Sequence, residues 1–258
     1  MKLHIYYRHT PVARSAGKFR PAWFTHERCF LNLLDTVRAH LVAGTVHLTV
    51  VFDGTGQDLQ NDFIPTHLVR EGHANPSILD AVRTVRIDGG DQRKAWRACV
   101  NLVRHDVDDA IGKGDTIYLL ENDYMHRPGW IEEVGALAEQ GVEWDYLTLY
   151  DHPDKYPNHC SHPDAARYSA LRVKLFATAT RHWRTVPGTC ATYMLSRETF
   201  LRDHVLLKQG IFDFNLFRIL TRMKRRVVIS PIPALSTHSM SGLLAPTVDW
   251  DEVIKGRP

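Results

Sequence analysis

The sequence predicts one α/β domain of 258 residues, built on a mostly parallel central sheet with helices on both faces. Apolar runs rich in β-branched and aromatic residues alternate with segments whose apolar residues recur every three or four positions, and this β-α-β order is typical of parallel sheets. The length suits one large α/β unit. No internal repeat and no linker rich in Gly, Ser or Pro divides the chain. The alternation stops after Asp151, so 1–151 and 152–258 are expected to form two halves of one domain, the second irregular.

The first half shows five expected strands joined by helices. The strands are expected at 2–8, 47–52, 85–87, 115–120 and 146–150. The helices are expected at 25–44, 77–83, 92–111 and 130–140, with a long polar connection before the second. Thr25 offers a side-chain oxygen that can cap the first helix, and Gly44 can end it.

The second half mixes shorter elements. The turn-rich stretch 154–165 is followed by short strands within 170–183 and by a further strand at 189–195. Two helices are expected from 196 onward and at 215–223, then a last strand at 227–229 and an irregular segment at 231–242. Ser196 suits the N-cap of the first of these helices.

Composition excludes several classes of protein. With 44% apolar and 24% charged residues, the chain has an ordinary globular composition rather than a disordered one. The four cysteines lie far apart and form no CxxC pair, which argues against a disulfide framework. The N-terminal apolar run is too short and too polar for a signal peptide, and no stretch approaches the length of a membrane span. We therefore expect a cytoplasmic protein.

Polar side chains follow several predicted strands at the point where each strand ends. Arg8 and Asp53 follow the first two strands, Asp88 the third, and Glu121-Asn122-Asp123 the fourth. Ligands of parallel sheets bind beyond the carboxyl ends of the strands. Mg²⁺ and Mn²⁺ prefer oxygen ligands, and one or two carboxylates plus substrate phosphates usually hold them. The pattern predicts a metal-diphosphate site at this edge.

Structural explanations also exist for the same residues. Asp123 could be a solvated turn residue, and Asp53 could cap a turn with Gly54, because Asp-Gly is a common turn pair. Arg8 could pair with a surface carboxylate.

The strand that runs into Glu121-Asn122-Asp123, followed by a Gly-Trp pair that opens a helix, resembles the DxD-type motif of GT-A fold glycosyltransferases, and is similar to family 2. The resemblance covers most of the chain. It implies a single GT-A-like (Rossmann-like) domain in which 1–151 binds a nucleotide sugar and 152–258 binds the acceptor. The motif departs from the family pattern at Asn122, so Asp123 is expected to hold the metal. Glu121 is expected to contact the ribose or a water molecule.

The resemblance assigns expected roles to individual residues. The donor-binding residues would be Arg8, Asp53, Gly90, Arg97 and Glu121. Asp123 and His238 would bind Mn²⁺ or Mg²⁺, although His238 could be a loop histidine with structural partners only. The catalytic base would be Asp213, which no Glu precedes, or Asp151. Asp213 could instead be a carboxylate favoured by a helix N-terminus.

The acceptor side contains a basic window. No acidic residue lies between Asp164 and Glu198, while arginines interleave with aromatic residues. Cations for phosphates and aromatic faces for bases are typical of nucleic-acid contact. The expected acceptor-binding residues are Arg172, Lys174, Arg181, Trp183 and, from the resemblance, Thr189. A solvated face with core aromatics would show the same pattern.

The leading prediction is a metal-dependent glycosyltransferase that inverts the anomeric centre. Its acceptor would be a saccharide or a hydroxymethylated base in DNA. A sugar nucleotidyltransferase is an alternative, although the basic stretch 13–20 lacks a GxGxxG or P-loop pattern. A non-catalytic nucleotide-sugar or nucleic-acid binding module is another. His159, Cys160 and His162 lack the separated pairs of a structural zinc site. The oligomeric state is left open.

Overall fold

The computed structural model describes residues 2–11, 18–156, 158 and 171–255. Nine strands form one sheet in the order β3-β2-β1-β4-β9-β6-β10-β8-β7. The strands are β1 (Leu3–His9), β2 (Val46–Asp53), β3 (Val82–Ile87), β4 (Thr116–Glu121), β6 (Tyr146–Leu147), β7 (Leu175–Ala177), β8 (His182–Thr185), β9 (Tyr193–Ser196) and β10 (Val228–Ile232). A second, two-stranded sheet pairs β5 (Tyr124–His126) with β11 (Ser236–His238).

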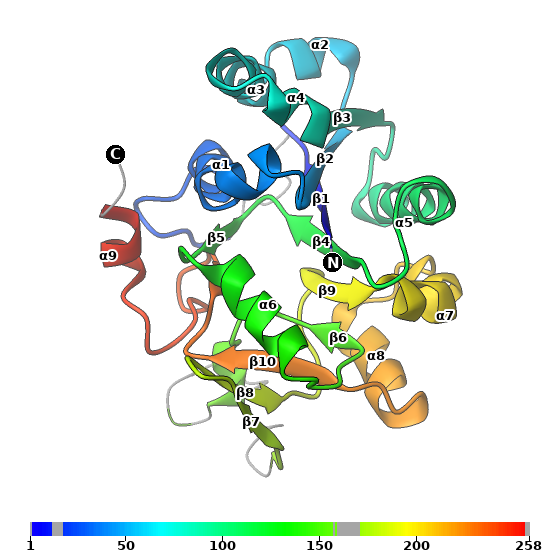
Figure 1. The fold of residues 1–258 in the computed structure, drawn as a ribbon, viewed down its shortest axis with the longest axis vertical. Coiled ribbons are helices and arrows are strands. Elements are labelled where there is room, and N and C mark those ends of the chain that lie inside the picture. Colours follow the sequence, from blue (N-terminus) through cyan, green and yellow to red (C-terminus); the bar gives the residue numbers. More distant parts are fainter. Residues whose placement is uncertain (1, 12–17, 157, 159–170, 256–258) are drawn as a thin grey trace.

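The helices connect these strands around the large sheet (Figure 1). They are α1 (His26–Val42), α2 (Gly56–Gln60), α3 (Phe63–Ala74), α4 (Ser77–Ala81), α5 (Gln92–Asp109), α6 (Trp130–Glu139), α7 (Arg197–Leu207), α8 (Asp213–Arg218) and α9 (Trp250–Lys255). A 3-10 turn, η1 (Pro153–Lys155), and a π-helical turn, η3 (Ile219–Met223), complete the described elements.

The predicted mostly parallel sheet is confirmed. Strands β3, β2, β1 and β4 are parallel neighbours, and β10 is parallel to β6. Strand β9 is antiparallel to both β4 and β6, so a strand from the second half of the chain separates the last two strands of the first half. Alternation along the sequence could not predict this order, because it contains no information on which strand edges meet.

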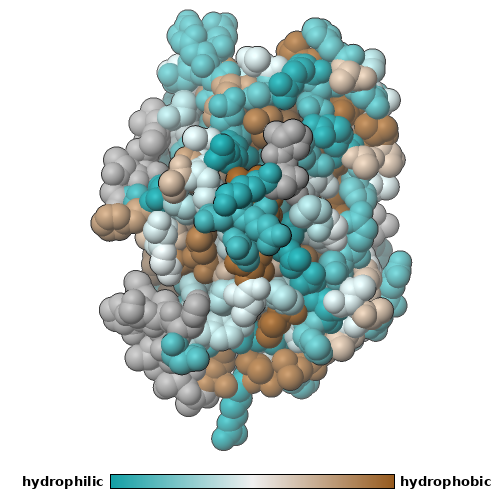
Figure 2. Space-filling view, turned by 90° about the vertical axis from the view of Figure 1, so that its left-hand side faces the viewer, coloured by the Kyte–Doolittle hydropathy of each residue, from teal (hydrophilic) through white to brown (hydrophobic). Residues whose placement is uncertain are grey.

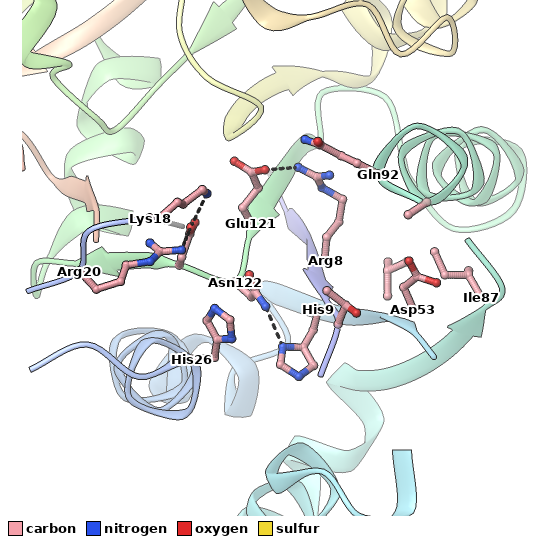
Figure 3. Close-up of a pocket in the computed structure, with 14 residues that line it drawn as sticks. Arg8, His9, Lys18, Arg20, His26, Asp53, Ile87, Gln92, Glu121 and Asn122 are labelled. Carbon is pink, nitrogen blue, oxygen red and sulfur yellow. Dashed lines mark hydrogen bonds and ion pairs between the residues drawn. The ribbon is translucent and has the colours of Figure 1, made fainter. Parts of the chain in front are cut away.

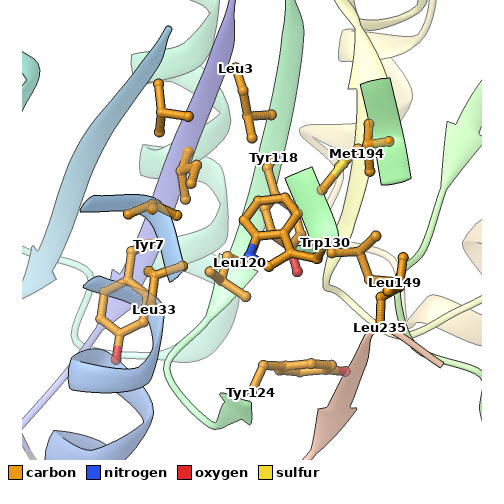
Figure 4. Packing of buried hydrophobic residues seen from close by; sticks show 14 of the residues in the cluster. Leu3, Tyr7, Leu33, Tyr118, Leu120, Tyr124, Trp130, Leu149, Met194 and Leu235 are labelled. Atoms are coloured by element: carbon orange, nitrogen blue, oxygen red, sulfur yellow. The ribbon is translucent and has the colours of Figure 1, made fainter. Parts of the chain in front are cut away.

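Helices cover both faces of the sheet, as predicted. Alternate residues of β1 face opposite sides: Ile5 and Tyr7 join a core with α1 and α6, whereas Tyr6 joins a core with α5 and α7. Figure 4 shows the first core, where Trp130 packs between β4 and the chain near Leu235. Burial on both faces explains why β4 reads as a nearly continuous apolar run, whereas the edge strand β3 is partly exposed and carries Arg83 and Arg86.

Several element boundaries differ from the sequence prediction. The polar connection after β2 contains α2 and α3, because Thr55 and Asp58 form a capping box and Asp62 caps α3. Strand β6 ends at Leu147 rather than at residue 150, since the Thr148 hydroxyl accepts the Tyr150 N–H at 3.2 Å and turns the backbone. The segment expected to be irregular contains β11. The Thr25 and Ser196 caps are confirmed.

Among the described residues, no helix has both the length and the apolar character required to cross a membrane. One face of the molecule is mostly hydrophilic, with hydrophobic residues in small groups among the polar ones (Figure 2).

Candidate functional site

A cavity of about 220 Å³ lies at the carboxyl ends of β1, β2, β3 and β4 (Figure 3). The parallel register places Arg8 beside Glu121 and Asp53 beside Ile87, so consecutive strand ends deliver their side chains to one edge. The cavity is lined by Arg8, His9, Thr10, Lys18, Arg20, His26, Val51, Asp53, Ile87, Gln92, Ala95, Glu121, Asn122 and Asp123. Asp88 is exposed and is not part of this lining.

Arg8 is held at the floor of the cavity by three contacts. Its Nη2 lies 3.1 Å from Oε1 of Glu121 and donates to the Ala191 carbonyl at 3.3 Å. Its guanidinium carbon lies 4.7 Å from the centre of the Trp96 ring, which is within the range of a cation-π contact. The backbone N–H of Glu121 donates to the Thr192 hydroxyl at 3.1 Å. The strand ends of β1 and β4 are thereby tied to the chain entering β9.

Asp53 shapes the same cavity from β2. Its Oδ1 accepts the N–H groups of Gly89 and Gly90 at 2.8 and 3.3 Å, so the carboxylate caps the turn between β3 and α5 rather than a turn with Gly54. Gly90 has φ of 66°, a conformation that favours glycine. Arg97 is exposed on α5, outside the cavity lining, whereas Gln92 in the first turn of that helix lines it.

Asp123 is the most enclosed carboxylate of the cavity, with 4% of its surface exposed. Its Oδ2 lies 3.0 Å from His238 Nε2, 2.9 Å from Arg20 Nη2 and 3.3 Å from Lys18 Nζ. Burial alone would raise the pKa of Asp123, but the His238 contact and the neighbouring positive charges hold it far below its usual range. Its other oxygen, Oδ1, is buried and has no hydrogen-bond partner among the described residues.

The pairing of β5 with β11 brings His238 to Asp123, because His238 lies opposite Tyr124 in that sheet. The two residues expected to bind metal are therefore neighbours, although the sequence separates them by 115 positions. Sequence reasoning did not assign Lys18 and Arg20 to this site. Arg20 is fixed there, since it donates to the Ser239 carbonyl at 2.7 Å and its guanidinium lies 4.2 Å from the Phe24 ring centre.

The donor atoms at Asp123 fit a divalent cation held largely by its substrate. The described residues contain no group of three or more His, Cys, Asp or Glu that could hold a metal ion. Asp123 Oδ1 is nevertheless without a partner among the described residues, and His238 already contacts Oδ2 of the same carboxylate. Mg²⁺ or Mn²⁺ commonly needs only one or two carboxylates when phosphates supply further ligands, so a cation at Asp123 would need such ligands from a bound molecule.

Asn122, the departure from the acidic motif, has a structural role. Its amide nitrogen lies 3.1 Å from His9 Nδ1 (Figure 3). On the other side of the ring, His9 Nε2 lies 3.0 Å from Oδ2 of Asp62. If Nε2 carries the proton that the Asp62 carboxylate accepts, Nδ1 accepts from the Asn122 amide. An aspartate at position 122 would place a second acceptor against Nδ1. The chain Asp62-His9-Asn122 therefore fixes the turn that carries Asp123.

A second cavity, of about 190 Å³, is lined by Asp213, which contacts the same Ala191 peptide as Arg8 of the first cavity. The Ala191 carbonyl accepts from Arg8 in the first cavity, and its N–H donates to Asp213 in the second. Asp213 is half-buried at the start of α8. Burial and the negative charge of Glu121 raise the pKa of Asp213 to about 7, against the opposing effect of Arg8.

The other candidate base, Asp151, lies in neither cavity. It is fully buried and its Oδ1 accepts from Arg184 Nη2 at 2.6 Å, while Oδ2 accepts the Tyr156 hydroxyl. Both oxygens are thus occupied by neighbours in the protein, and Asp151 is a structural carboxylate in this conformation.

The residues expected to bind the acceptor are scattered. Thr189 lines the second cavity with Asp213. Trp183 has no exposed surface and belongs to the core, so the expectation that an acceptor stacks on it is wrong for this conformation. Arg181 donates to the Pro233 carbonyl and pairs with Glu133. Arg172 and Lys174 are exposed but line neither cavity.

The zinc alternative cannot be placed in this structure, because His159, Cys160 and His162 lie outside the described residues.

Comparisons with known proteins assign no family. No protein-family model matches the chain, and no curated protein matches it. Among solved structures, a candidate nucleotide-diphospho-sugar transferase from Desulfovibrio desulfuricans G20 is 12% identical, with a TM-score of 0.44 over 89% of this chain and 80% of that one.

Two further solved structures are 4-diphosphocytidyl-2C-methyl-D-erythritol synthases. The first is 14% identical, with a TM-score of 0.44 over 99% of this chain and 97% of that one. The second, from Anaerococcus prevotii DSM 20548, is 6% identical, with a TM-score of 0.43 over 98% and 93% of the two chains. At these identities and TM-scores, the likeness does not indicate an activity for this chain.

Proposed function

We propose that this protein is a nucleotide-sugar-dependent glycosyltransferase, with the donor in the first cavity and the acceptor in the second. The observation that supports it most is the position of Asp213. This carboxyl group, with a pKa of about 7, lines the second cavity and accepts the N–H of Ala191, whose carbonyl accepts from Arg8 of the first cavity. A proton acceptor between two adjoining sites is what transfer between two bound substrates requires.

The donor's diphosphate would lie against Asp123, Lys18 and Arg20. The two cations already approach the Asp123 carboxylate within 3.3 Å, and phosphate oxygens could accept hydrogen bonds from the same donors. Asp123 and His238 would hold Mn²⁺ or Mg²⁺, which would neutralise charge on the departing diphosphate. Arg8 and Glu121 would contact the sugar or ribose, since both line the first cavity and Arg8 also donates to the Ala191 carbonyl, on the side of Asp213.

The reaction follows from this placement. The acceptor hydroxyl oxygen attacks the anomeric carbon, the bond from that carbon to the diphosphate oxygen breaks, and the nucleoside diphosphate leaves with the electron pair. Asp213 takes the proton from the attacking hydroxyl, and a pKa near the operating pH suits a general base. A single displacement of this kind inverts the anomeric centre.

A panel of nucleotide sugars tests the proposal, with thermal shift for binding and nucleoside diphosphate release for turnover. A ligand that binds only the folded state raises the unfolding temperature. Asp213→Asn should keep the donor-induced shift and lose turnover by about 10²- to 10⁴-fold. Asp123→Ala should lose the metal-dependent part of the shift. The matched control is Asp88→Asn, which removes an exposed carboxylate at the same sheet edge.

The outcomes separate the candidate functions. Donor binding without any turnover would identify a binding module, and no response to any donor would overturn the proposal. An unchanged turnover in Asp213→Asn would exclude this residue as the base.

Sugar nucleotidyl transfer is the second candidate, and the position of Lys18 and Arg20 favours it. Both residues follow β1 and line the first cavity, where a basic segment would hold a triphosphate. This reaction would consume a nucleoside triphosphate and a sugar phosphate and would release pyrophosphate. Pyrophosphate release, with no turnover of nucleotide sugars, would select it over glycosyl transfer.

A further inference from the structure

The second cavity has a composition that suggests which acceptor it takes, provided that the proposed transfer is correct. It lies between η1, the chain at 187–190, α8 and η3. The lining residues that bear on this question are Asp213, Phe212, Phe214, Arg218 and Arg222.

Two arginines of the cavity have no counter-ion. Arg218 and Arg222 are exposed and lie four residues apart across α8 and η3. Their guanidinium groups make no hydrogen bond or ion pair with any residue that the structure describes. Residues at this spacing are neighbours on a helical surface. The guanidinium groups are therefore available to a ligand, and their planar donor forks match phosphate oxygens.

The positive charge continues past the cavity. Arg225 follows at the end of η3 and is also exposed, without a counter-ion in the described part of the chain. Between Asp203 and Asp249 the sequence contains one acidic residue, Asp213, whose carboxyl is half-buried and has a raised pKa. Three unpaired arginines exceed what one anionic group needs. They suit a chain with repeated charges.

Aromatic side chains flank Asp213, the candidate general base. Phe212 has 75% of its surface exposed and Phe214 has 38%, and they immediately precede and follow Asp213. Single exposed hydrophobic residues are common on protein surfaces, but here two aromatic side chains and two arginines line one cavity. The nucleobases of a single strand stack on aromatic side chains of this kind, and this stacking does not depend on the base sequence.

We propose that the second cavity binds a nucleic-acid strand, with one base against Phe212, the hydroxyl to be modified at Asp213, and phosphates on Arg218, Arg222 and Arg225. This interface lies on α8 and η3 rather than on the basic window that contains Arg172 and Lys174. In the described part of that window the candidate aromatic Trp183 is buried, and Arg172 and Lys174 line neither cavity. On α8 and η3, by contrast, arginines and exposed aromatic side chains lie beside the same cavity.

Binding of a fluorescein-labelled, mixed-sequence single DNA strand, followed by anisotropy over a salt series, tests the location. We expect the double variant Arg218→Ala/Arg222→Ala to weaken binding at least tenfold and to reduce the slope of log Kd against log salt by about 1.4, since each phosphate contact on a single strand contributes about 0.7. The matched control, Arg172→Ala/Lys174→Ala, removes the same charge and should stay within about twofold in Kd.

Phe212→Ala provides a separate signature. Loss of stacking should weaken binding by about fivefold to a hundredfold without changing the salt slope, because no phosphate contact is lost. All of these side chains are exposed, and unfolding temperatures should confirm that the variants fold.

Three results would overturn the nucleic-acid proposal. The proposal fails if wild type does not bind the strand, if the 172/174 variant carries the salt slope, or if polygalacturonate displaces the strand at equal charge concentration, which would indicate an anionic saccharide. Donor turnover is measured on the same proteins. Turnover without strand binding refutes only the nucleic-acid acceptor, whereas strand binding without response to any donor refutes the glycosyltransferase.

Discussion

Asp213 should make the protein less stable while making it active, and Asp213→Asn should reverse both effects. The pKa of this carboxyl rises from 3.8 to about 7 on folding. The folded state therefore holds the proton more tightly than the unfolded state. Below about pH 3.8 both states are protonated and nothing is lost. As pH rises from 3.8 to 7 the unfolded state ionises first, so the folded state loses stability progressively, and the full cost applies above pH 7.

The loss of folding free energy at high pH can be worked out from the difference between the folded and unfolded pKa values of Asp213. A difference of 7 − 3.8, about 3 units, at 1.36 kcal/mol per unit gives an upper limit of about 4 kcal/mol at pH 8. Partial exposure of Asp213 reduces this to roughly 2 kcal/mol. At pH 5 the folded carboxyl is still protonated, and less than half of the cost is present. Asparagine carries no charge and keeps an oxygen that can accept from the Ala191 N–H.

Thermal unfolding at pH 5 and pH 8 measures the effect. For a chain of this size, 2 kcal/mol corresponds to about 4–8 °C in unfolding temperature. Asp213→Asn should therefore unfold about 4–8 °C above wild type at pH 8 and only slightly above it at pH 5. The control Asp88→Asn, an exposed carboxylate, should change neither value. An equal gain at both pH values, or a loss at pH 8, would refute the proposed ionisation of Asp213.

Three further predictions concern neighbouring groups. Glu121→Gln removes a negative charge that raises the pKa of Asp213, so the acidic limb of the pH-rate profile should move to lower pH; a limb that stays in place would show that Asp213 is not the titrating base. Asn122→Ala leaves His9 Nδ1 without its donor and should lower the free energy of unfolding by about 1–3 kcal/mol in urea titration, and no change would mean that the contact is not formed. His238→Ala should abolish the Mn²⁺-dependent thermal shift measured with a nucleotide sugar, and a retained shift would place the metal elsewhere.

Local patterns predicted much of the fold. The apolar stripe of α1 and its Thr25 cap both appear as expected, because a helical face and an N-cap depend on spacings of a few residues. The capped helices α2 and α3 were missed, since α2 has 5 residues and buries none of them, and α3 buries only Ile64, Glu71 and Gly72 of its 12. The capping residues Thr55 and Asp62 were the sequence signal that could have predicted these two helices.

The candidate site was predictable in part for a similar reason. Arg8, Asp53 and Glu121 end consecutive parallel strands, and parallel strands bring their carboxyl ends to one edge whatever their order. Lys18 and Arg20 have no such relation to a strand. Only the folded path of the chain after β1 places them on Asp123.

The sequence by itself determined the α/β class, the polar edge of the sheet and the place of Glu121-Asn122-Asp123 at a strand end on that edge, because these depend on periodicity and chain order. The tertiary structure decided what the carboxylates face. The pairing of β5 with β11 sets His238 against Asp123, and the insertion of β9 brings Ala191 between Arg8 and Asp213. It also buries Trp183 and exposes Phe212. These relations join residues 115 positions apart, as for Asp123 and His238, or 183 positions apart, as for Arg8 and Ala191, and pairing across such separations is governed by packing rather than by local propensity.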